Sequence, residues 1–186
     1  MALPASGQIS ISQISTELGR ASTATTSLGE TAARTLAGVA SGQISMSNFY
    51  GKSAGFTFNQ TISANTANYN LKSAAIAAGW NQTDKLFATV TINSGIYVYS
   101  TSTGAYAFQT GATFPAGSTL ALINNGIILG MGGAGAAGMN SSVYVATTTN
   151  GAVGGPALLA QQAISITNNG IIGGGGGGGG NGASFS

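Results

Sequence analysis

A short motif that recurs 44 residues apart, each time followed by a glycine-rich run, is the feature that most constrains this chain. The earlier copy reads Ile123-Asn-Asn-Gly-Ile-Ile128 and the later one Thr167-Asn-Asn-Gly-Ile-Ile172, which continues into eight consecutive glycines, 173–180. A weaker third copy is Ile92-Asn-Ser-Gly-Ile-Tyr97. Because Asn and Gly tolerate positive φ, each copy predicts a tight turn between two β-prone segments.

The glycine-rich runs, residues 126–138 and 170–180, are consistent with several structures. A flexible linker would leave them unordered, and a phosphate-binding loop lacks the Gly-Lys-Ser/Thr that should follow it. Collagen is excluded because proline occurs only at positions 4, 115 and 156. We therefore expect polyproline-II-like glycine helices packed against like helices through backbone hydrogen bonds. The expected scaffold glycines are Gly126, Gly130, Gly132, Gly133, Gly135, Gly170, Gly173, Gly175, Gly177 and Gly179.

The near absence of ionisable groups limits the chemistry. Charged residues make up 4% of the chain, none follows Lys85, and histidine and cysteine are absent. With only three scattered carboxylates there is no basis for general acid–base catalysis or metal binding, so we expect a non-enzyme with no catalytic residue, cofactor or metal. The net charge of +2 comes from too few groups to bind nucleic acid. Such a chain would be poorly soluble as a free monomer, which favours a place in an assembly. No apolar run is long enough to span a membrane, and the start of the chain shows no secretory signal.

Residues 1–53 form a unit with an internal echo, since Ser6-Gly-Gln-Ile-Ser-Ile-Ser-Gln-Ile14 recurs as Ser41-Gly-Gln-Ile-Ser-Met-Ser-Asn-Phe49. A capping box formed by Ser27 and Glu30 predicts a helix from Leu28 to Ala37, closed by Gly38. Short helical turns are expected from Ser12 to Leu18 and from Ser47 to Tyr50. The apolar residues suffice only for a small cluster, so the unit either packs on a partner chain or is an ordinary subdomain. They are Ile9, Ile11, Ile14, Leu18, Leu28, Leu36, Val39, Ile44, Met46 and Phe49.

Residues 54–123 read as a β-rich domain with one short helix, which Asn70 caps and which runs from Leu71 to Ala78. Trp80 is expected to anchor a core rather than to bind a ligand. The expected strands are Phe56–Ile62, Leu86–Ile92, Ile96–Tyr99, Tyr106–Phe108 and Ser118–Ile123. Residues 124–186 would form a glycine-rich distal module. The expected fold is thus mainly β, with a small α-helical N-terminal unit and then a solenoid- or sandwich-like β region with polyglycine-II-type segments.

Two stretches of the chain resemble a known group of proteins. Residues 6–53, with Ser-Gly-Gln-Ile-Ser at both ends and Ser27-Leu-Gly-Glu30 between them, resemble a segment of tailed-bacteriophage virion proteins that precedes tail-fibre or tail-tip regions. Asn68-Tyr-Asn-Leu-Lys-Ser-Ala-Ala-Ile-Ala-Ala-Gly-Trp80, followed by the Asn-Asn-Gly-Ile-Ile motif and its glycine run, resembles phage tail-fibre and tail-tip adhesins.

The resemblance implies a structural tail-fibre or tail-tip protein of the virion, made in the host cytoplasm. Residues 1–53 would dock to other phage tail proteins, and the glycine-rich C-terminal end would contribute to binding a host-cell surface receptor. The expected receptor-facing loop residues are Tyr144, Thr147, Thr148, Thr149 and Asn150. The thin N-terminal cluster and the need of the glycine runs for backbone partners predict a homotrimer.

Two alternatives stay open from the sequence. The chain could be a purely structural virion subunit of the tail tip, collar or head decoration, without receptor contact. An ice- or surface-binding protein with flat Thr and Ala arrays is a third class, which the irregular spacing of the threonines disfavours.

Overall fold

The computed structural model describes residues 2–136 and 150–180, and the chain divides into two compact units. The first unit comprises Met1–Thr57, Gly79–Phe87 and Phe114–Ser118, and the second contains the remainder of the chain. In the described residues the fold is mainly β, with parallel sheets and three α-helices, which confirms the expected fold class at that level. The predicted division into 1–53, 54–123 and 124–186 stays a prediction.

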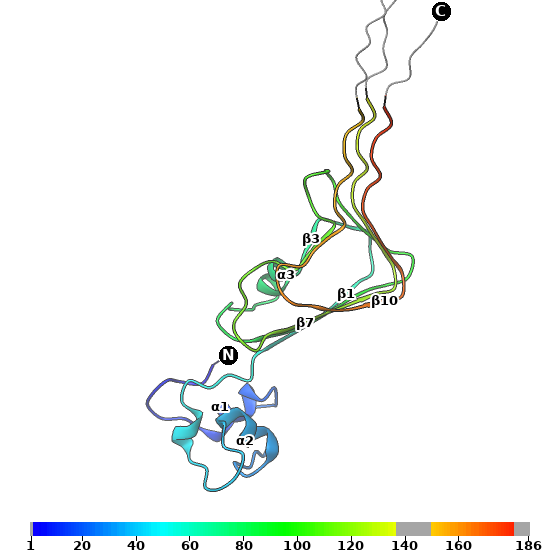
Figure 1. Ribbon diagram of the computed structural model, residues 1–186. Coiled ribbons are helices and arrows are strands. Elements are labelled where there is room, and N and C mark those ends of the chain that lie inside the picture. Colours follow the sequence, from blue (N-terminus) through cyan, green and yellow to red (C-terminus); the bar gives the residue numbers. More distant parts are fainter. Residues whose placement is uncertain (1, 137–149, 181–186) are drawn as a thin grey trace, which may run out of the picture. The chain divides into compact units, whose positions relative to one another are not determined.

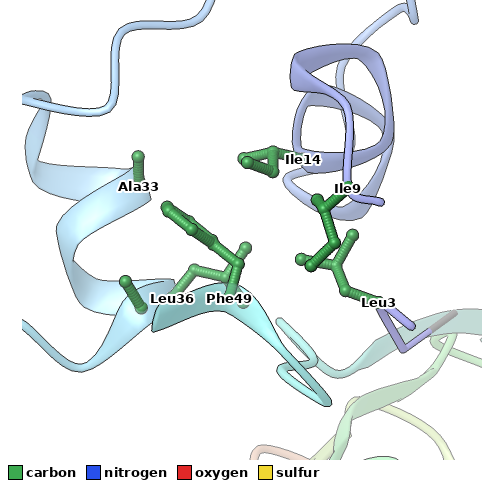
Figure 2. Close-up of a cluster of buried hydrophobic side chains, with 7 residues drawn as sticks. Leu3, Ile9, Ile14, Ala33, Leu36 and Phe49 are labelled. Carbon is green, nitrogen blue, oxygen red and sulfur yellow. The ribbon is translucent and has the colours of Figure 1, made fainter. Parts of the chain in front are cut away.

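The first unit contains helices α1 (Ile11–Glu17) and α2 (Thr31–Ala37) and the 3₁₀-helix η1 (Met46–Phe49). Its core lies between these helices and the start of the chain (Figure 2). All ten apolar residues that the sequence analysis assigned to the cluster are buried in it or packed against it. The fully or nearly fully buried members are Leu3, Ile9, Ile14, Ala33, Leu36, Ala37 and Phe49. The cluster is small, as the sequence predicted.

The echo between residues 6–14 and 41–49 produces two equivalent helix starts. The backbone N–H of Ser10 donates to Gln13 Oε1, and that of Ser45 donates to Asn48 Oδ1, both at 2.8 Å. Each pair forms a capping box, in which a residue three positions ahead satisfies an amide that the helix cannot. The two copies of one sequence therefore fold into the same local hydrogen-bond pattern.

The capping box expected at Ser27 and Glu30 is wrong. Helix α2 begins at Thr31, with Glu30 itself as N-cap residue, and Ser27 Oγ accepts from the N–H of Gly29. Glu30 instead forms an ion pair with Arg20 at 2.5 Å. A charge-assisted bond is stronger than a bond to a neutral amide, so the guanidinium outcompetes the backbone for this carboxylate. The end of the helix is as predicted, with Gly38 in the left-handed conformation.

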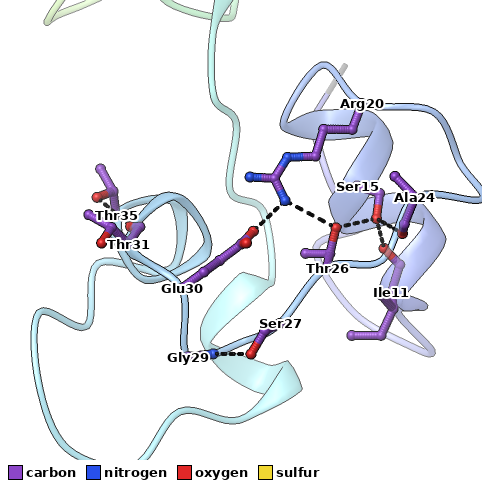
Figure 3. A network of polar contacts seen from close by, with 10 residues as sticks. All are labelled: Ile11, Ser15, Arg20, Ala24, Thr26, Ser27, Gly29, Glu30, Thr31 and Thr35. Carbon is purple, nitrogen blue, oxygen red and sulfur yellow. Dashed lines mark hydrogen bonds and ion pairs between the residues drawn. The ribbon is translucent and has the colours of Figure 1, made fainter.

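A polar network joins the helices of the first unit (Figure 3). Arg20 also contacts Thr26 Oγ1 at 3.4 Å, and Thr26 shares a hydrogen bond of 2.7 Å with the buried Ser15 hydroxyl. Arg34 donates to the carbonyls of Gly29 and Gly42, both at 3.1 Å. Charged side chains here hold loops in place, which supplements the small apolar core.

The second unit is built from three sheets that the chain visits in turn (Figure 1). Their strand orders are β1-β4-β7-β10, β11-β8-β5-β2 and β3-β6-β9, so strands of successive passes lie next to each other. The strands are β1 (Phe56–Ile62), β2 (Thr66–Ala67), β3 (Tyr69–Asn70), β4 (Leu86–Ile92), β5 (Tyr97–Tyr99), β6 (Phe108–Gln109), β7 (Thr119–Asn124), β8 (Ile127–Leu129), β9 (Leu158–Leu159), β10 (Ser165–Asn168) and β11 (Ile171–Gly173).

The predicted elements of this region are largely confirmed. Strand β4 alternates between buried and half-buried side chains over its seven residues, as its sequence predicted. Helix α3 (Leu71–Ala77) begins where Asn70 Oδ1 accepts from the N–H of Ser73 at 2.9 Å. Trp80 is buried and stacks on Phe114, with ring centroids 5.5 Å apart, so its assignment to a core is confirmed.

The 44-residue period of the sequence equals the offset between paired residues in two pairs of adjacent parallel strands. Asn168 pairs with Asn124 in the parallel strands β10 and β7, and Ile171 pairs with Ile127 in β11 and β8. The weaker copy is shifted by one residue, because Tyr97 rather than Ile96 pairs with Ile127. An extra residue at that corner therefore precedes β5.

The corners are not the positive-φ turns that Asn-Asn-Gly predicted. Among the three copies only Gly95 has a positive φ, 76°. Gly126 is required for a different reason, because a Cβ there would lie 2.6 Å from the carbonyl oxygen of Asn93. Gly170 likewise sits against the backbone of Asn125 and Gly126 from the preceding pass. Parallel corners stacked this closely leave no room for a side chain, so close approach selects glycine.

Candidate functional site

Three glycine-rich segments leave the sheets and run side by side (Figure 1). Segment A (130–136) follows β8, segment B (150–155) precedes β9, and segment C (173–180) contains the end of β11 and the residues after it. We call the three together the glycine bundle. Segments A and C run in the same direction and segment B runs against both, as their hydrogen-bond partners show.

Backbone hydrogen bonds connect the segments at every third residue. From A to C, the N–H groups of Gly130, Gly133 and Ala136 donate to Gly173, Gly176 and Gly179, at 2.8 to 2.9 Å. From B to A, Ala152 donates to Ala134 and Gly155 to Met131, at 2.8 and 2.7 Å. From C to B, Gly175 donates to Gly155 and Gly178 to Ala152, both at 2.8 Å. Each segment thus donates to one neighbour and accepts from the other, which closes a ring of three.

The same three-residue period decides where glycine is needed. The inward positions are Gly130 and Gly133 in segment A, Gly151 and Gly154 in segment B, and Gly175 and Gly178 in segment C. A Cβ at any of them would fall far inside contact distance of a carbonyl group of a neighbouring segment. The backbones therefore meet without intervening side chains, which only glycine permits.

The other expected scaffold glycines have different environments. Gly126 and Gly170 lie at sheet corners, as described above. Gly132, Gly135, Gly173 and Gly177 would place a Cβ at ordinary contact distance, 3.4 to 3.9 Å from the nearest atom, and Gly179 would place it in open space. Within one chain these five positions have room for a side chain.

Sequence reasoning missed segment B and the inward glycines Gly151, Gly154 and Gly178. Segment B has no long glycine run, so composition alone did not mark it. The signal was spacing, because Gly151 and Gly154 repeat at three residues, as do Gly130 and Gly133.

A pair of asparagines supports the base of the bundle. Asn124 is fully buried, and its side-chain amide donates to Asn168 Oδ1 at 2.7 Å and to the carbonyl of Ile171 at 3.1 Å. Its own Oδ1 accepts from the N–H of Gly126 at 3.2 Å. Every polar atom of this side chain therefore has a partner, which ties the corner before segment A to the corner before segment C.

Of the expected receptor-facing residues, the structure describes Asn150 alone. Asn150 is exposed and opens segment B, while Tyr144, Thr147, Thr148 and Thr149 lie outside the described residues. The bundle holds both flanks of residues 137–149, through Ala136 on one side and Ala152 on the other.

The surface of the glycine bundle consists of groups with little chemical reactivity. It contains no charged residue, and the described parts of the chain hold no group of His, Cys, Asp or Glu that could bind a metal. What it presents is backbone, small side chains and a few exposed apolar ones such as Met131 and Val153.

None of the helices within residues 2–136 and 150–180 has the length and apolar character to cross a membrane.

Comparison with known families shows which family the chain belongs to. Residues 57–186, more than half of the chain, match the family described as "Phage tail fibre adhesin Gp38". The chain belongs to this family. No curated protein and no solved structure matches it. As a Gp38-type adhesin it is a structural protein of the bacteriophage tail fibre that takes part in host attachment, which confirms the resemblance stated from the sequence.

Proposed function

We propose that this adhesin contacts its host receptor through the end of the glycine bundle, with Asn150 and residues 137–149 as the contact region. The observation that supports this is the ring of backbone hydrogen bonds that closes the three segments. A rigid scaffold presents variable loop residues at low entropic cost, which suits recognition. Tyr144, Thr147, Thr148 and Thr149 supply the aromatic and hydroxyl groups for it. Nothing in this role requires catalysis, so the protein acts as a binder and not as an enzyme.

We infer that the bundle is a polyglycine-II assembly and that the sheets form a β-solenoid. The three-residue period of the hydrogen bonds matches three residues per turn. Three parallel sheets visited in turn fit a solenoid better than a sandwich, whose sheets are antiparallel.

The N-terminal unit is proposed to dock to other tail proteins of the virion. Residues 1–53 hold five of the eight charged residues of the chain, and their apolar core is small. A recess of about 210 Å³, lined in part by Leu3, Pro4 and Thr16, opens on their surface. The homotrimer expected from the sequence is retained as a proposal on the strength of this unit alone, because the glycine segments of one chain already pair with each other.

The receptor proposal is tested with particles that carry substitutions in the contact region. Joint replacement of Tyr144, Thr147 and Thr149 by alanine should abolish most host adsorption and leave the amount of subunit per particle unchanged. The matched control replaces exposed threonines of β1, Thr57 and Thr61, by alanine. Normal adsorption by the triple variant would overturn the receptor role and leave the purely structural alternative.

Docking is tested by truncation. A fragment of residues 1–53 should be incorporated into particles, and a chain ending at Ile123 should be incorporated but fail to support full adsorption. Failure of both truncated chains to enter the particle, with the full chain present in controls, would contradict docking through the N-terminal unit.

A further inference from the structure

One Asn-Gly pair at the entry of the glycine bundle differs chemically from the other two in the described part of the chain. The three pairs are Asn125–Gly126, Asn150–Gly151 and Asn169–Gly170. In any such pair the peptide nitrogen of glycine can attack the asparagine side-chain carbonyl carbon, since glycine has no Cβ to hinder the approach. The N–C bond that forms closes a five-membered succinimide and expels ammonia. Water then opens the ring to aspartate or, by cleavage of the other C–N bond, to isoaspartate.

The two corner pairs are held against this reaction. Asn169 donates its side-chain amide to Asn125 Oδ1 at 2.9 Å, so each asparagine fixes the other. The N–H of Gly126 is occupied by Asn124 Oδ1. Attack at either pair has to break these contacts first.

Asn150 and Gly151 lack the hydrogen bonds that hold the corner pairs. It is exposed, and among the described residues its side chain forms no hydrogen bond. The N–H of Gly151, the nucleophile after loss of its proton, has no backbone acceptor within the described residues either. Within the described residues, no hydrogen bond therefore holds either reacting group.

We propose that Asn150–Gly151 is a spontaneous deamidation site through which the adhesin alters its own tip. Isoaspartate adds one methylene to the main chain directly before Gly151. That glycine is packed so closely that an added Cβ would lie 2.7 Å from the carbonyl oxygen of Gly179. The extra methylene would therefore shift segment B out of register with segment C. The product also carries a negative charge in a part of the chain that has none after Lys85. Both changes fall on the proposed contact region, but the reaction itself does not depend on receptor binding.

The experiment follows deamidation of the full-length chain by peptide mass spectrometry during incubation in neutral buffer at physiological temperature. Asn150 should react at least about tenfold faster than Asn125 and Asn169, a difference of about 1.4 kcal/mol in barrier. In denaturant the three rates should converge, because the local sequence Asn-Gly is the same. The peptide of Asn181–Gly182, which lies outside the described residues, is measured separately. Equal rates at Asn150 and at either corner pair in the folded protein would overturn the proposal.

Two variants separate the effect of the added charge from the effect of the added methylene. Asn150→Gln should not deamidate at position 150 on this timescale, because the longer side chain would have to close a less favourable six-membered ring. Asn150→Asp introduces the charge without the methylene and should keep the melting temperature of the fresh protein, whereas aged protein rich in isoaspartate should melt several degrees lower. Aged protein that melts like Asn150→Asp would contradict the proposed loss of register.

Discussion

Whether a glycine of the bundle can be replaced depends on its place in the three-residue period. Gly175 and Gly178 face the carbonyls of Met131 and Ala134, whereas a methyl group added at Gly176 or Gly179 would have no atom within 4 Å. None of these four has a positive φ, so alanine is not strained by its backbone at any of them. Adjacent glycines in one uninterrupted run thus differ in what they contribute to stability.

This difference predicts opposite outcomes for two double substitutions. Gly175→Ala with Gly178→Ala should lower the free energy of unfolding by about 2 kcal/mol or more, because each methyl overpacks the bundle. Gly176→Ala with Gly179→Ala should be neutral or stabilise slightly, since alanine loses less backbone entropy on folding. Chemical denaturation of both variants measures the effect. Equal destabilisation by the two pairs would mean that the period of three does not govern the packing.

The buried asparagine at the base of the bundle supports a second prediction. Asn124→Ala removes the partners of the Gly126 N–H and the Ile171 carbonyl, and about 1–3 kcal/mol is lost for each polar group left buried and unpaired. Asn125→Ala, at the neighbouring position, removes one exposed side-chain hydrogen bond and should cost less than about 1 kcal/mol. Urea denaturation of the two variants gives the comparison, and a cost at Asn125 as large as at Asn124 would contradict this account of the corner.

At the scale of the element, the duplicated capping boxes define a third prediction. Ser10→Ala and Ser45→Ala should each lower the stability of the N-terminal unit by about 1 kcal/mol, because each removes an N-cap. Ser27→Ala is the control and should cost only a small fraction of that, since Ser27 caps no helix. Thermal unfolding followed by circular dichroism reports the loss. A cost at Ser27 equal to that at Ser10 would restore the capping box that the sequence predicts there.

Strand β3 makes the stability of the second unit sensitive to alkaline pH. Burial raises the pKa of Tyr69 above its ordinary value of 10.0, and its hydroxyl donates to Gln60 Oε1. A raised pKa in the folded state means that the stabilising contribution is complete below about pH 10 and is lost as the pH rises above it. Tyr69→Phe should therefore flatten the decline of unfolding free energy above about pH 10, relative to the unaltered chain. Identical slopes of unfolding free energy against pH for both proteins would show that Tyr69 has the same pKa in the folded and unfolded states.

The elements that the sequence predicted best are those whose signal is local. The alternation of β4 and the asparagine cap of α3 each depend on neighbouring residues, and both are confirmed. The capping box at Ser27 failed because a residue ten positions away, Arg20, competes for Glu30. The register of β5 failed for a similar reason, since pairing with β8 and not the local motif decides which residue starts the strand.

At the scale of the whole molecule, the glycine bundle shows what a single sequence leaves out. The two glycine-rich runs and their 44-residue period are readable in the sequence, and they form segments A and C. Segment B is not marked by composition, because it contains no long glycine run, and only the three-residue spacing of Gly151 and Gly154 points to it. One consequence is that the backbone pairing from which three chains were predicted is met within one.

The proposed homotrimer would then depend on the N-terminal unit, which predicts where it can be disrupted. Light scattering of the full chain at micromolar concentration should give three times the mass of one chain, and removal of residues 1–53 should reduce it to the monomer. A truncated chain that stays trimeric would place the contacts between copies in the second unit. A monomeric full chain would remove the homotrimer altogether.

The ring of three segments also limits how the length of the glycine bundle can change between members of this family. Inserting one or two residues into any segment would shift its inward glycines away from their partners, whereas three residues restore the match. Segment B runs against the other two, so it must grow in step with both. Length should therefore vary between related adhesins in increments of one turn, three residues in every segment at once. Each increment would carry the proposed contact region about 9 Å further from the sheets.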